Sequence, residues 1–354
     1  MNAARITART ARITGLILPL LASSGLAQTV TATLPAPTLD RWNYPFASQP
    51  GIEAAIPTFA ALRQTGFDDR DSQFLLGFDT GSVVPAGLGG ARYVIESAAL
   101  TIHVSSELRF IYDPSFDSVA TSYDPTDPAF VADADAGKPV ELFPVGYRNG
   151  FSDATYGESS AYSPFPPFPP REGVRNAFAA TFDASGLPTV DIGRHVRQRF
   201  EAIPMGVGMN PDLTVGALVP AGSSLTFAID LSMPGVADYL ARGMNAGQVR
   251  FMVSSLHAAS GGPGGGTGDV IYPTFFSKEN PLAAQAGYLS SLTFRVTAHP
   301  GADFNIDGGV DGADIEAFFI AWQAGEAHAD FNLDGGIDGS DIEAFFIAWE
   351  NGGG

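Results

Sequence analysis

The sequence contains no cysteine and few basic residues: 19 Lys and Arg stand against 38 Asp and Glu in 354 residues, a formal net charge of −19. The absence of cysteine excludes disulfides, thiolate nucleophiles and thiolate metal ligands. The negative charge argues against nucleic acid as a partner, because phosphates bind to cationic surfaces. No apolar run beyond the N-terminal segment is long enough to cross a bilayer, so no membrane span is expected.

Catalytic motifs are also scarce. The sequence has no G-x-S-x-G and no H-E-x-x-H, and two of its five scattered histidines, His103 and His257, lie inside strand-like patterns. FDDRD at Phe67–Asp71 gathers three carboxylates around an arginine, but a glycosidase needs two carboxylates about 5–9.5 Å apart in a cleft. We interpret this cluster as a structural Arg–Asp network or a calcium site. The catalytic residues stay unknown, and the sequence favours a protein that is not an enzyme.

The N-terminal segment, residues 1–27, reads as a secretory signal peptide. Arg5, Arg9 and Arg12 form a positive region, and Ile13–Leu21 is an apolar core too short to span a bilayer. Its removal takes away three arginines and no acids, which changes the formal charge to −19 − 3 = −22. We therefore predict a protein that is secreted, extracellular or at the cell surface; a retained N-terminal anchor is the alternative.

Residues 28–298 have the pattern of a mainly β domain. The 41 glycines and 26 prolines of the sequence indicate many turns between short apolar runs. Strands are expected within Phe67–Thr80, Arg92–Tyr112, Ala177–Phe182, Ser224–Ser232, Gln248–His257 and Ser291–His299. Helices are expected at Ile192–Ala202 and Val236–Met244. The pattern predicts a jelly-roll-like β-sandwich, followed at residues 299–354 by a separate module.

This C-terminal module contains one acidic segment twice. ADFNIDGGVDGADIEAFFIAW at 302–322 and ADFNLDGGIDGSDIEAFFIAW at 329–349 match at 18 of 21 positions. Residues 301–354 hold twelve acids and no Lys or Arg. In each copy, side-chain oxygens recur at loop positions 1, 3, 5, 9 and 12, glycine stands at position 6, and glycine at position 7 offers its carbonyl.

Hard oxygen ligands at this spacing suit Ca²⁺, and so many carboxylates repel one another unless a cation is bound. A solvated acidic turn is the alternative for one loop alone, but the repetition favours two Ca²⁺ sites. The predicted ligands are Asp303, Asn305, Asp307, Gly309, Asp311 and Asp314 in the first loop, and Asp330, Asn332, Asp334, Gly336, Asp338 and Asp341 in the second.

A helix is expected after each loop. Ile315, Phe318, Phe319 and Trp322 follow the i, i+3, i+4, i+7 spacing of one apolar face, and the second copy repeats it. The segment before the first loop is not helical, so the unit is not a full EF-hand. Two loop–helix units can cover each other's apolar face. The phenylalanines then form the module's core or, in part, a docking face for a partner, and both interpretations stay open.

The tail resembles a dockerin, the paired loop–helix calcium module that attaches secreted polysaccharide-degrading proteins to cohesins, and in particular the tails of many secreted planctomycete proteins. The resemblance covers residues 302–350 and rests on the duplicated D-x-N-x-D-G-x-[VI]-D-x-x-D. It implies the calcium ligands named above, a carbohydrate-associated role, and a cohesin-like or other cell-surface partner. The chain departs from cohesin-binding dockerins at Gly312-Ala313 and Gly339-Ser340, and neither helix carries Lys or Arg.

The segment QFLLGFDTGSVVPAGLGGARYVIESAALTIHV resembles secreted jelly-roll modules of the disaggregatase-related (DNRLRE) group, which implies contact with carbohydrate or a cell-surface role. Candidate sugar-stacking aromatics are Trp42, Tyr44, Phe46, Tyr112, Tyr123, Tyr147, Tyr156 and Tyr162. Our first hypothesis is a secreted, non-catalytic protein that binds polysaccharide or another surface component. The alternatives are a glycoside hydrolase or lyase with a dockerin tail, and an architectural envelope protein.

Overall fold

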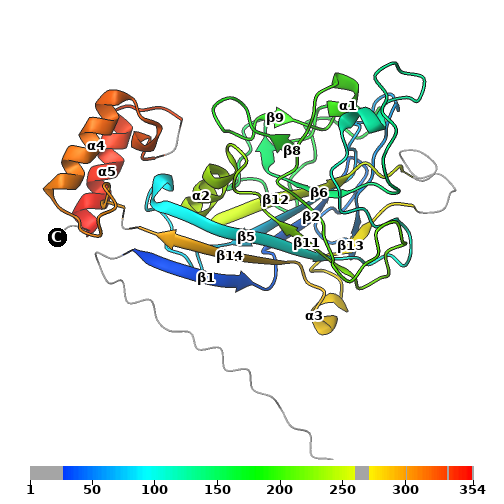
Figure 1. Ribbon diagram of the computed structural model, residues 1–354, viewed down its shortest axis with the longest axis horizontal. Helices are drawn as coiled ribbons and strands as arrows, with labels where there is room; N and C mark the ends of the chain where they lie inside the picture. The colour runs from blue at the N-terminus through cyan, green and yellow to red at the C-terminus, as the bar shows by residue number, and fades with distance from the viewer. Residues whose placement is uncertain (1–26, 260–270, 300, 333–334, 353–354) are drawn as a thin grey trace, which may run out of the picture.

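The computed structural model describes residues 27–259, 271–299, 301–332 and 335–352. Residues 1–26 of the predicted signal peptide, and Asp334 of the second predicted loop, lie outside these ranges. The described chain is mainly β, with several antiparallel sheets followed by a helical C-terminal segment (Figure 1). The prediction of a mainly β protein is confirmed.

Two large sheets form the body of the molecule. The first has the strand order β1 (Gln28–Leu34), β14 (Ser291–Ala298), β5 (Tyr93–His103), β11 (Ser224–Ala228). The second has the order β10 (Gly206–Val207), β6 (Val140–Phe143), β12 (Gln248–Ser255), β4 (Gln73–Asp79), β2 (Leu39–Asn43). The predicted strands at 224–232, 248–257 and 291–299 are thus confirmed, each ending slightly earlier than expected.

Smaller elements surround these sheets. Two short sheets pair β13 (Thr274–Phe276) with β3 (Ala55–Pro57), and β7 (Val145–Tyr147) with β8 (Ala177–Thr181) and β9 (Val190–Asp191). The α-helices are α1 (His195–Gln198), α2 (Val236–Ala246), α3 (Ala283–Ala286), α4 (Gly312–Ala324) and α5 (Gly339–Gly352). The 3-10 turns are η1 (Gly90–Arg92), η2 (Val119–Ser122) and η3 (Ala327–Ala329).

The main core lies between the two large sheets. Leu100 and Ile102 of β5 meet Phe74 and Leu76 of β4 there, at the alternate positions that place side chains on one face of a strand. Leu75, between the two β4 residues, belongs to a second core on the opposite face of the five-stranded sheet. Because both faces of this sheet are covered, β4 reads as an apolar run rather than as an alternation.

The predicted helix at Ile192–Ala202 is wrong in length, since α1 spans only four residues. Arg199 ends it with a left-handed backbone conformation (φ 59°). The N–H of Arg199 bonds back to the carbonyls of His195 and Val196, which closes the helix after one turn. The apolar spacing alone does not reveal this left-handed cap. The helix predicted at 236–244 is confirmed as α2.

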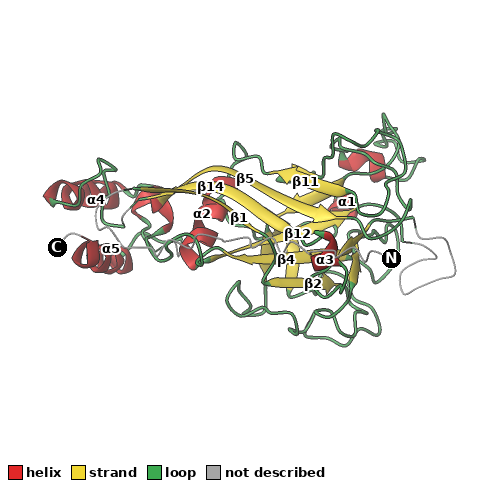
Figure 2. Cartoon of the chain, turned by 90° about the horizontal axis from the view of Figure 1, so that it is seen from below, coloured by secondary structure: helices red, strands yellow, loops and turns green. Residues whose placement is uncertain are grey.

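The C-terminal helices lie together at one end of the molecule. Figures 1 and 2 show α4 and α5 beyond the ends of β5 and β14, in views related by a 90° rotation. The first residue of β1, Gln28, pairs with Ala298 at the end of β14. The beginning of the β domain and its exit into the tail are therefore neighbours.

Candidate functional site

The first predicted calcium loop closes around Asp303. This carboxylate is fully buried and accepts the N–H groups of Asp307 (Oδ1, 3.1 Å) and Gly308 (Oδ2, 3.1 Å). Gly308 has a φ of 90°, where a residue with a Cβ is strained. Glycine at loop position 6 thus allows the backbone to turn back over the carboxylate at position 1.

The same loop ends on Asp314, in the first turn of α4. Its buried carboxylate accepts the Asp311 N–H at 2.8 Å and the Asn305 N–H at 3.1 Å. The Asp311 side chain accepts the Ala313 N–H at 2.8 Å, which completes a capping box. One carboxylate therefore connects both arms of the loop at a helix N-terminus, where the helix dipole favours negative charge.

The second loop repeats these bonds at the same positions. Asp341 is fully buried and accepts the N–H groups of Asn332 (3.2 Å) and Asp338 (2.8 Å). Gly335, also at φ 90°, donates its N–H to Asp330 at 3.0 Å. The duplicated sequence thus gives a duplicated backbone, with a carboxylate at each end of each loop.

The exposed carboxylates of the first loop, Asp307 and Asp311, accept hydrogen bonds from within the loop. Asp307 accepts bonds from the Gly309 N–H (2.9 Å) and the Asn305 side-chain amide (2.8 Å), and Asp311 caps α4. Among the described residues, the two groups of three acidic side chains with oxygens within 4.8 Å of one another both lie in the β domain. The donor set, all oxygens, fits Ca²⁺ by its chemistry, and ion binding requires the exposed carboxylates to rotate inward.

Four phenylalanines form the centre of the C-terminal module. Phe318 of α4 and Phe345 of α5 are fully buried and stacked, with ring centroids 4.3 Å apart and planes 3° apart. Phe304 and Phe331, one from each loop, stand edge-on to both stacked rings at centroid distances from 5.3 to 6.3 Å. Each unit therefore covers the aromatic face of the other, and Phe318 and Phe345 belong to the core.

The module contacts the β domain through η1. Arg92 is 2% exposed and donates from Nη1 to the Asp303 carbonyl at 2.6 Å. Its guanidinium lies 4.7 Å from the ring centre of Phe304 and 6.0 Å from that of Phe331. Gly89, at φ 91°, leaves room for the Phe331 carbonyl, which would lie 3.0 Å from an added Cβ. Asp303, the first predicted ligand of the first loop, is thus tied to the β domain through its backbone.

FDDRD forms a buried ion-pair network. Its pairs are Asp68–Arg175 (2.7 Å), Asp69–Arg197 (2.9 Å) and Arg70–Glu141 (2.5 Å). Residues 68–71 are at most 2% exposed, and burial raises the pKa of Asp71 to about 7. These contacts support the structural interpretation, because the carboxylates are paired with arginines inside the protein and do not face a cleft.

Most of the candidate sugar-stacking aromatics pack inside the protein. Tyr112 and Tyr156 are at most 4% exposed, and Trp42 stacks on the buried Tyr44 at 4.7 Å. Tyr123 lies beneath a guanidinium, 4.7 Å from the Arg199 Cζ atom. Phe46, Tyr147 and Tyr162 are the candidates that line cavities.

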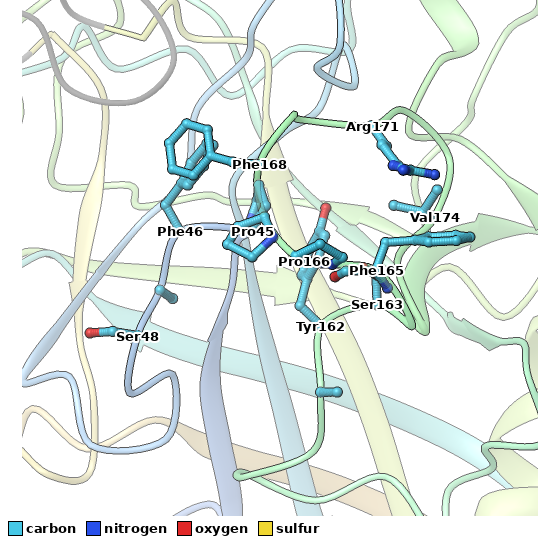
Figure 3. A pocket seen from close by; sticks show the side chains of 13 residues that line it. Pro45, Phe46, Ser48, Tyr162, Ser163, Phe165, Pro166, Phe168, Arg171 and Val174 are labelled. Atoms are coloured by element: carbon cyan, nitrogen blue, oxygen red, sulfur yellow. Dashed lines mark hydrogen bonds between the residues drawn. The ribbon is translucent and has the colours of Figure 1, made fainter.

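An open pocket of about 600 Å³ lies between the loop after β2 and the loop before β8 (Figure 3). Phe168, 69% exposed, and Phe46 form one side, with ring centroids 4.8 Å apart. The Arg171 guanidinium lies 4.4 Å above the Phe165 ring on the other side, and Tyr162 lies between. The lining contains aromatic, proline and serine residues and no carboxylate.

A second cavity of about 720 Å³ lies beside β7 and α2. Asp153 is the single carboxylate in its lining, together with Arg242 and Arg250. Burial raises the pKa of Asp153, whereas the nearby Arg250 and Arg242 act in the opposite direction. Neither of the two cavities presents the pair of carboxylates that glycoside hydrolysis requires.

The chain matches no known protein-family model and no curated protein. Within the ranges that the structure describes, no helix has the length and apolar character needed to cross a membrane, in agreement with the sequence. Sequence reasoning did not identify Arg92 as a contact of the tail, or Phe165, Phe168 and Arg171 as pocket residues. Phe46 and Tyr162, which also line the pocket, were predicted as sugar-stacking aromatics, and the run PFPPFPP is typical of a stiff loop or of a partner ligand.

Proposed function

We propose that the chain is a secreted, non-catalytic protein that binds two Ca²⁺ ions in a dockerin-like module and contacts carbohydrate or another surface component through its β domain. The paired loop geometry carries this proposal: in both loops the carboxylate at position 1 accepts the N–H of a glycine at φ 90° at position 6, and the carboxylate at position 12 is buried. The face-to-face packing of the two large sheets supports a jelly-roll-like β-sandwich as the finer description of the fold. The positive and apolar N-terminal segment supports secretion.

Calcium in the loops acts on the stability of the module. The ion supplies positive charge among carboxylates that otherwise repel one another. A segment of about 50 residues has a small core of its own, so ligand binding is a large part of its stability. At a calcium concentration about 100 times the dissociation constant, each site adds about 2.7 kcal/mol to the free energy of unfolding.

Isothermal titration calorimetry with CaCl₂ on the full chain tests this assignment. The double variant Asp303→Ala/Asp330→Ala is expected to lose two binding sites. The matched control is Glu316→Ala/Glu343→Ala, which removes the same charge from equivalent, exposed positions of α4 and α5. The proposal for the loops is abandoned if the aspartate variant binds as many ions as the unmodified chain, or if the control loses the same two sites.

The Phe46/Phe168 pocket supports contact with carbohydrate. Exposed aromatic rings beside an arginine and serines suit the apolar face and the hydroxyls of a sugar, and the lining has no carboxylate for hydrolysis. Hexasaccharides of cellulose, xylan and chitin serve as probes in affinity electrophoresis or calorimetry. Phe168→Ala is expected to weaken binding about tenfold, the effect of losing about 1.4 kcal/mol at an interface hot spot.

The control for the pocket is Phe116→Ala, which removes an exposed phenylalanine (44% exposed) in a different loop. Equal loss in both variants would show that the pocket is not the binding site. No retention of any of the three probes would remove the carbohydrate part of the proposal and favour the architectural alternative.

Exposed isoleucines support a protein partner for the module. Ile320 of α4 is 61% exposed and Ile347 of α5, its equivalent in the second copy, is 54% exposed. A cohesin-like or other cell-surface protein with an apolar patch fits this pair, whereas the stacked Phe318 and Phe345 are inaccessible. Ile320→Ser/Ile347→Ser is expected to abolish calcium-dependent binding of the chain to cell-envelope protein. Surface plasmon resonance with CaCl₂ and with EDTA measures this binding. Unchanged binding would contradict the proposal that these isoleucines form the docking face.

A further inference from the structure

A second oxygen-rich site lies in the β domain, in the long connection between β5 and β6. The sequence there contains two acidic stretches, Asp113-Pro-Ser-Phe-Asp117 and Asp133-Ala-Asp135. The first places oxygen side chains at every second residue, the spacing with which calcium loops begin. The second returns to the same place, because Gly137, at φ 117°, brings the chain so close that an added Cβ would lie 3.0 Å from the Asp113 Cβ.

Three carboxylates converge in this loop. One oxygen from each of Asp113, Asp117 and Asp135 lies within 4.8 Å of the others. Oxygens that share one Ca²⁺ at about 2.3–2.6 Å from the ion are at most about 5 Å apart, so this spacing is that of ligands around one ion. The Ser115 hydroxyl lies between two of these carboxylates, 2.6 Å from Asp113 Oδ1 and 3.1 Å from Asp135 Oδ2.

The buried carboxylate of Asp113 provides an independent observation. This residue is 3% exposed, and its Oδ1 atom accepts the N–H and the hydroxyl of Ser115. Its Oδ2 atom is shielded from solvent and has no hydrogen-bond partner within the described ranges. A buried acceptor without a partner costs about 1–3 kcal/mol, and more when it is charged. A bound cation removes this cost.

The charges around the cluster leave room for a cation. Lys138 Nζ lies 2.7 Å from Asp117 Oδ2 and 2.6 Å from Asp133 Oδ2, so it neutralises part of the charge. Four carboxylates (Asp113, Asp117, Asp133, Asp135) and one ammonium leave a formal charge of −4 + 1 = −3. The lysine contacts Asp117 and Asp133, while Asp113 and Asp135 have no cationic partner among the described ion pairs.

We propose that Asp113, Asp117 and Asp135 bind one Ca²⁺ ion, at a site separate from the C-terminal loops. Carboxylate and hydroxyl oxygens are hard ligands, and the set has no nitrogen or sulfur for Zn²⁺. Asp113 is buried while Asp135 is exposed, which leaves one side of the ion open to water. Ca²⁺ accepts such an irregular shell, whereas Mg²⁺ demands near-ideal octahedral geometry. The ion joins the two acidic stretches of the connection.

Calorimetry with CaCl₂ on the full chain tests this site. The tail loops are first silenced with Asp303→Ala/Asp330→Ala, and this variant is expected to retain one calcium site. Adding Asp135→Asn, an exposed position that leaves the core intact, is expected to weaken that site at least tenfold, because one carboxylate ligand is lost. In the unmodified chain, the same substitution is expected to reduce the stoichiometry by one ion.

The matched control is Asp133→Asn. Asp133 lies two residues before Asp135 and carries the same charge. Its side chain contacts Lys138 and is not one of the three converging carboxylates. A change of threefold or less is expected for it. The proposal is overturned if the silenced variant binds no calcium, or if Asp133→Asn and Asp135→Asn weaken binding equally. Both comparisons are made in the Asp303→Ala/Asp330→Ala background. They therefore test the Asp113/Asp117/Asp135 site whether or not the C-terminal loops bind calcium.

Discussion

Substitution of Arg92 by alanine removes the contact between η1 and the C-terminal module. A cation–π contact shielded from water contributes about 2 kcal/mol, and a hydrogen bond from a charged donor contributes about 1.5–3 kcal/mol. Part of this loss is offset, because burying the guanidinium of Arg92 costs desolvation free energy that the alanine variant does not have to supply. We therefore expect Arg92→Ala to lower the local unfolding free energy of the module by about 3 kcal/mol, since both Phe304 and the Asp303 carbonyl lose their partner.

Hydrogen exchange followed by mass spectrometry measures this local stability. A change of about 3 kcal/mol corresponds to about a hundredfold faster exchange of the α4 amides. Amides of β12, in the core of the β domain, are expected to keep their protection. The matched control is Arg295→Ala, which removes an exposed pair with Glu96 and is expected to change exchange less than fivefold. Equal α4 exchange in Arg92→Ala and in the unmodified chain would refute the reasoning.

Three further outcomes are expected. Phe345→Ala removes one of the two stacked, fully buried rings and should lower the free energy of unfolding of the module by about 3–5 kcal/mol. The circular dichroism signal of α4 and α5 should then be lost even in calcium, and a retained helical signal would contradict the assigned core. EDTA should lower the melting temperature of the unmodified chain, and should lower that of Asp303→Ala/Asp330→Ala/Asp135→Asn much less. Burial lowers the pKa of His257 to about 3, so the folded state binds fewer protons than the unfolded state between about pH 6.5 and 3 and loses stability on acidification. Between pH 7 and pH 5, this residue should lower the free energy of unfolding by about 2 kcal/mol. Urea unfolding of His257→Leu should not show this part of the pH dependence.

The sequence was sufficient for the elements in which local pattern and tertiary environment agree. The strand at 291–298 has one buried and one exposed face, so alternation identifies it. The helices of the tail follow from apolar spacing, which the second copy repeats. The turn at Gly308 also follows, because only glycine tolerates that backbone angle without strain.

Long-range contacts determined the rest. The Phe46/Phe168 pocket joins two loops more than a hundred residues apart, and no local signal relates them. The FDDRD cluster looked acidic along the chain, but its carboxylates meet arginines from distant segments. Asp113 and Asp135 are likewise separated by a long connection, and the chain's return at Gly137 brings them together. Such partners become visible only when the sheets and loops are placed in space.

The stacked pair of Phe318 and Phe345 also bears on how the module arose. A single loop–helix unit carries one ring of the stack and one edge-on ring, which is half of a core. The duplication therefore completes a core that one unit holds only in half, and joining two copies in one chain makes their association independent of concentration. Arg92 contacts the first copy through the Asp303 carbonyl and the Phe304 ring and lies 6.0 Å from the Phe331 ring of the second, so one residue of the β domain reaches the core that the two copies share.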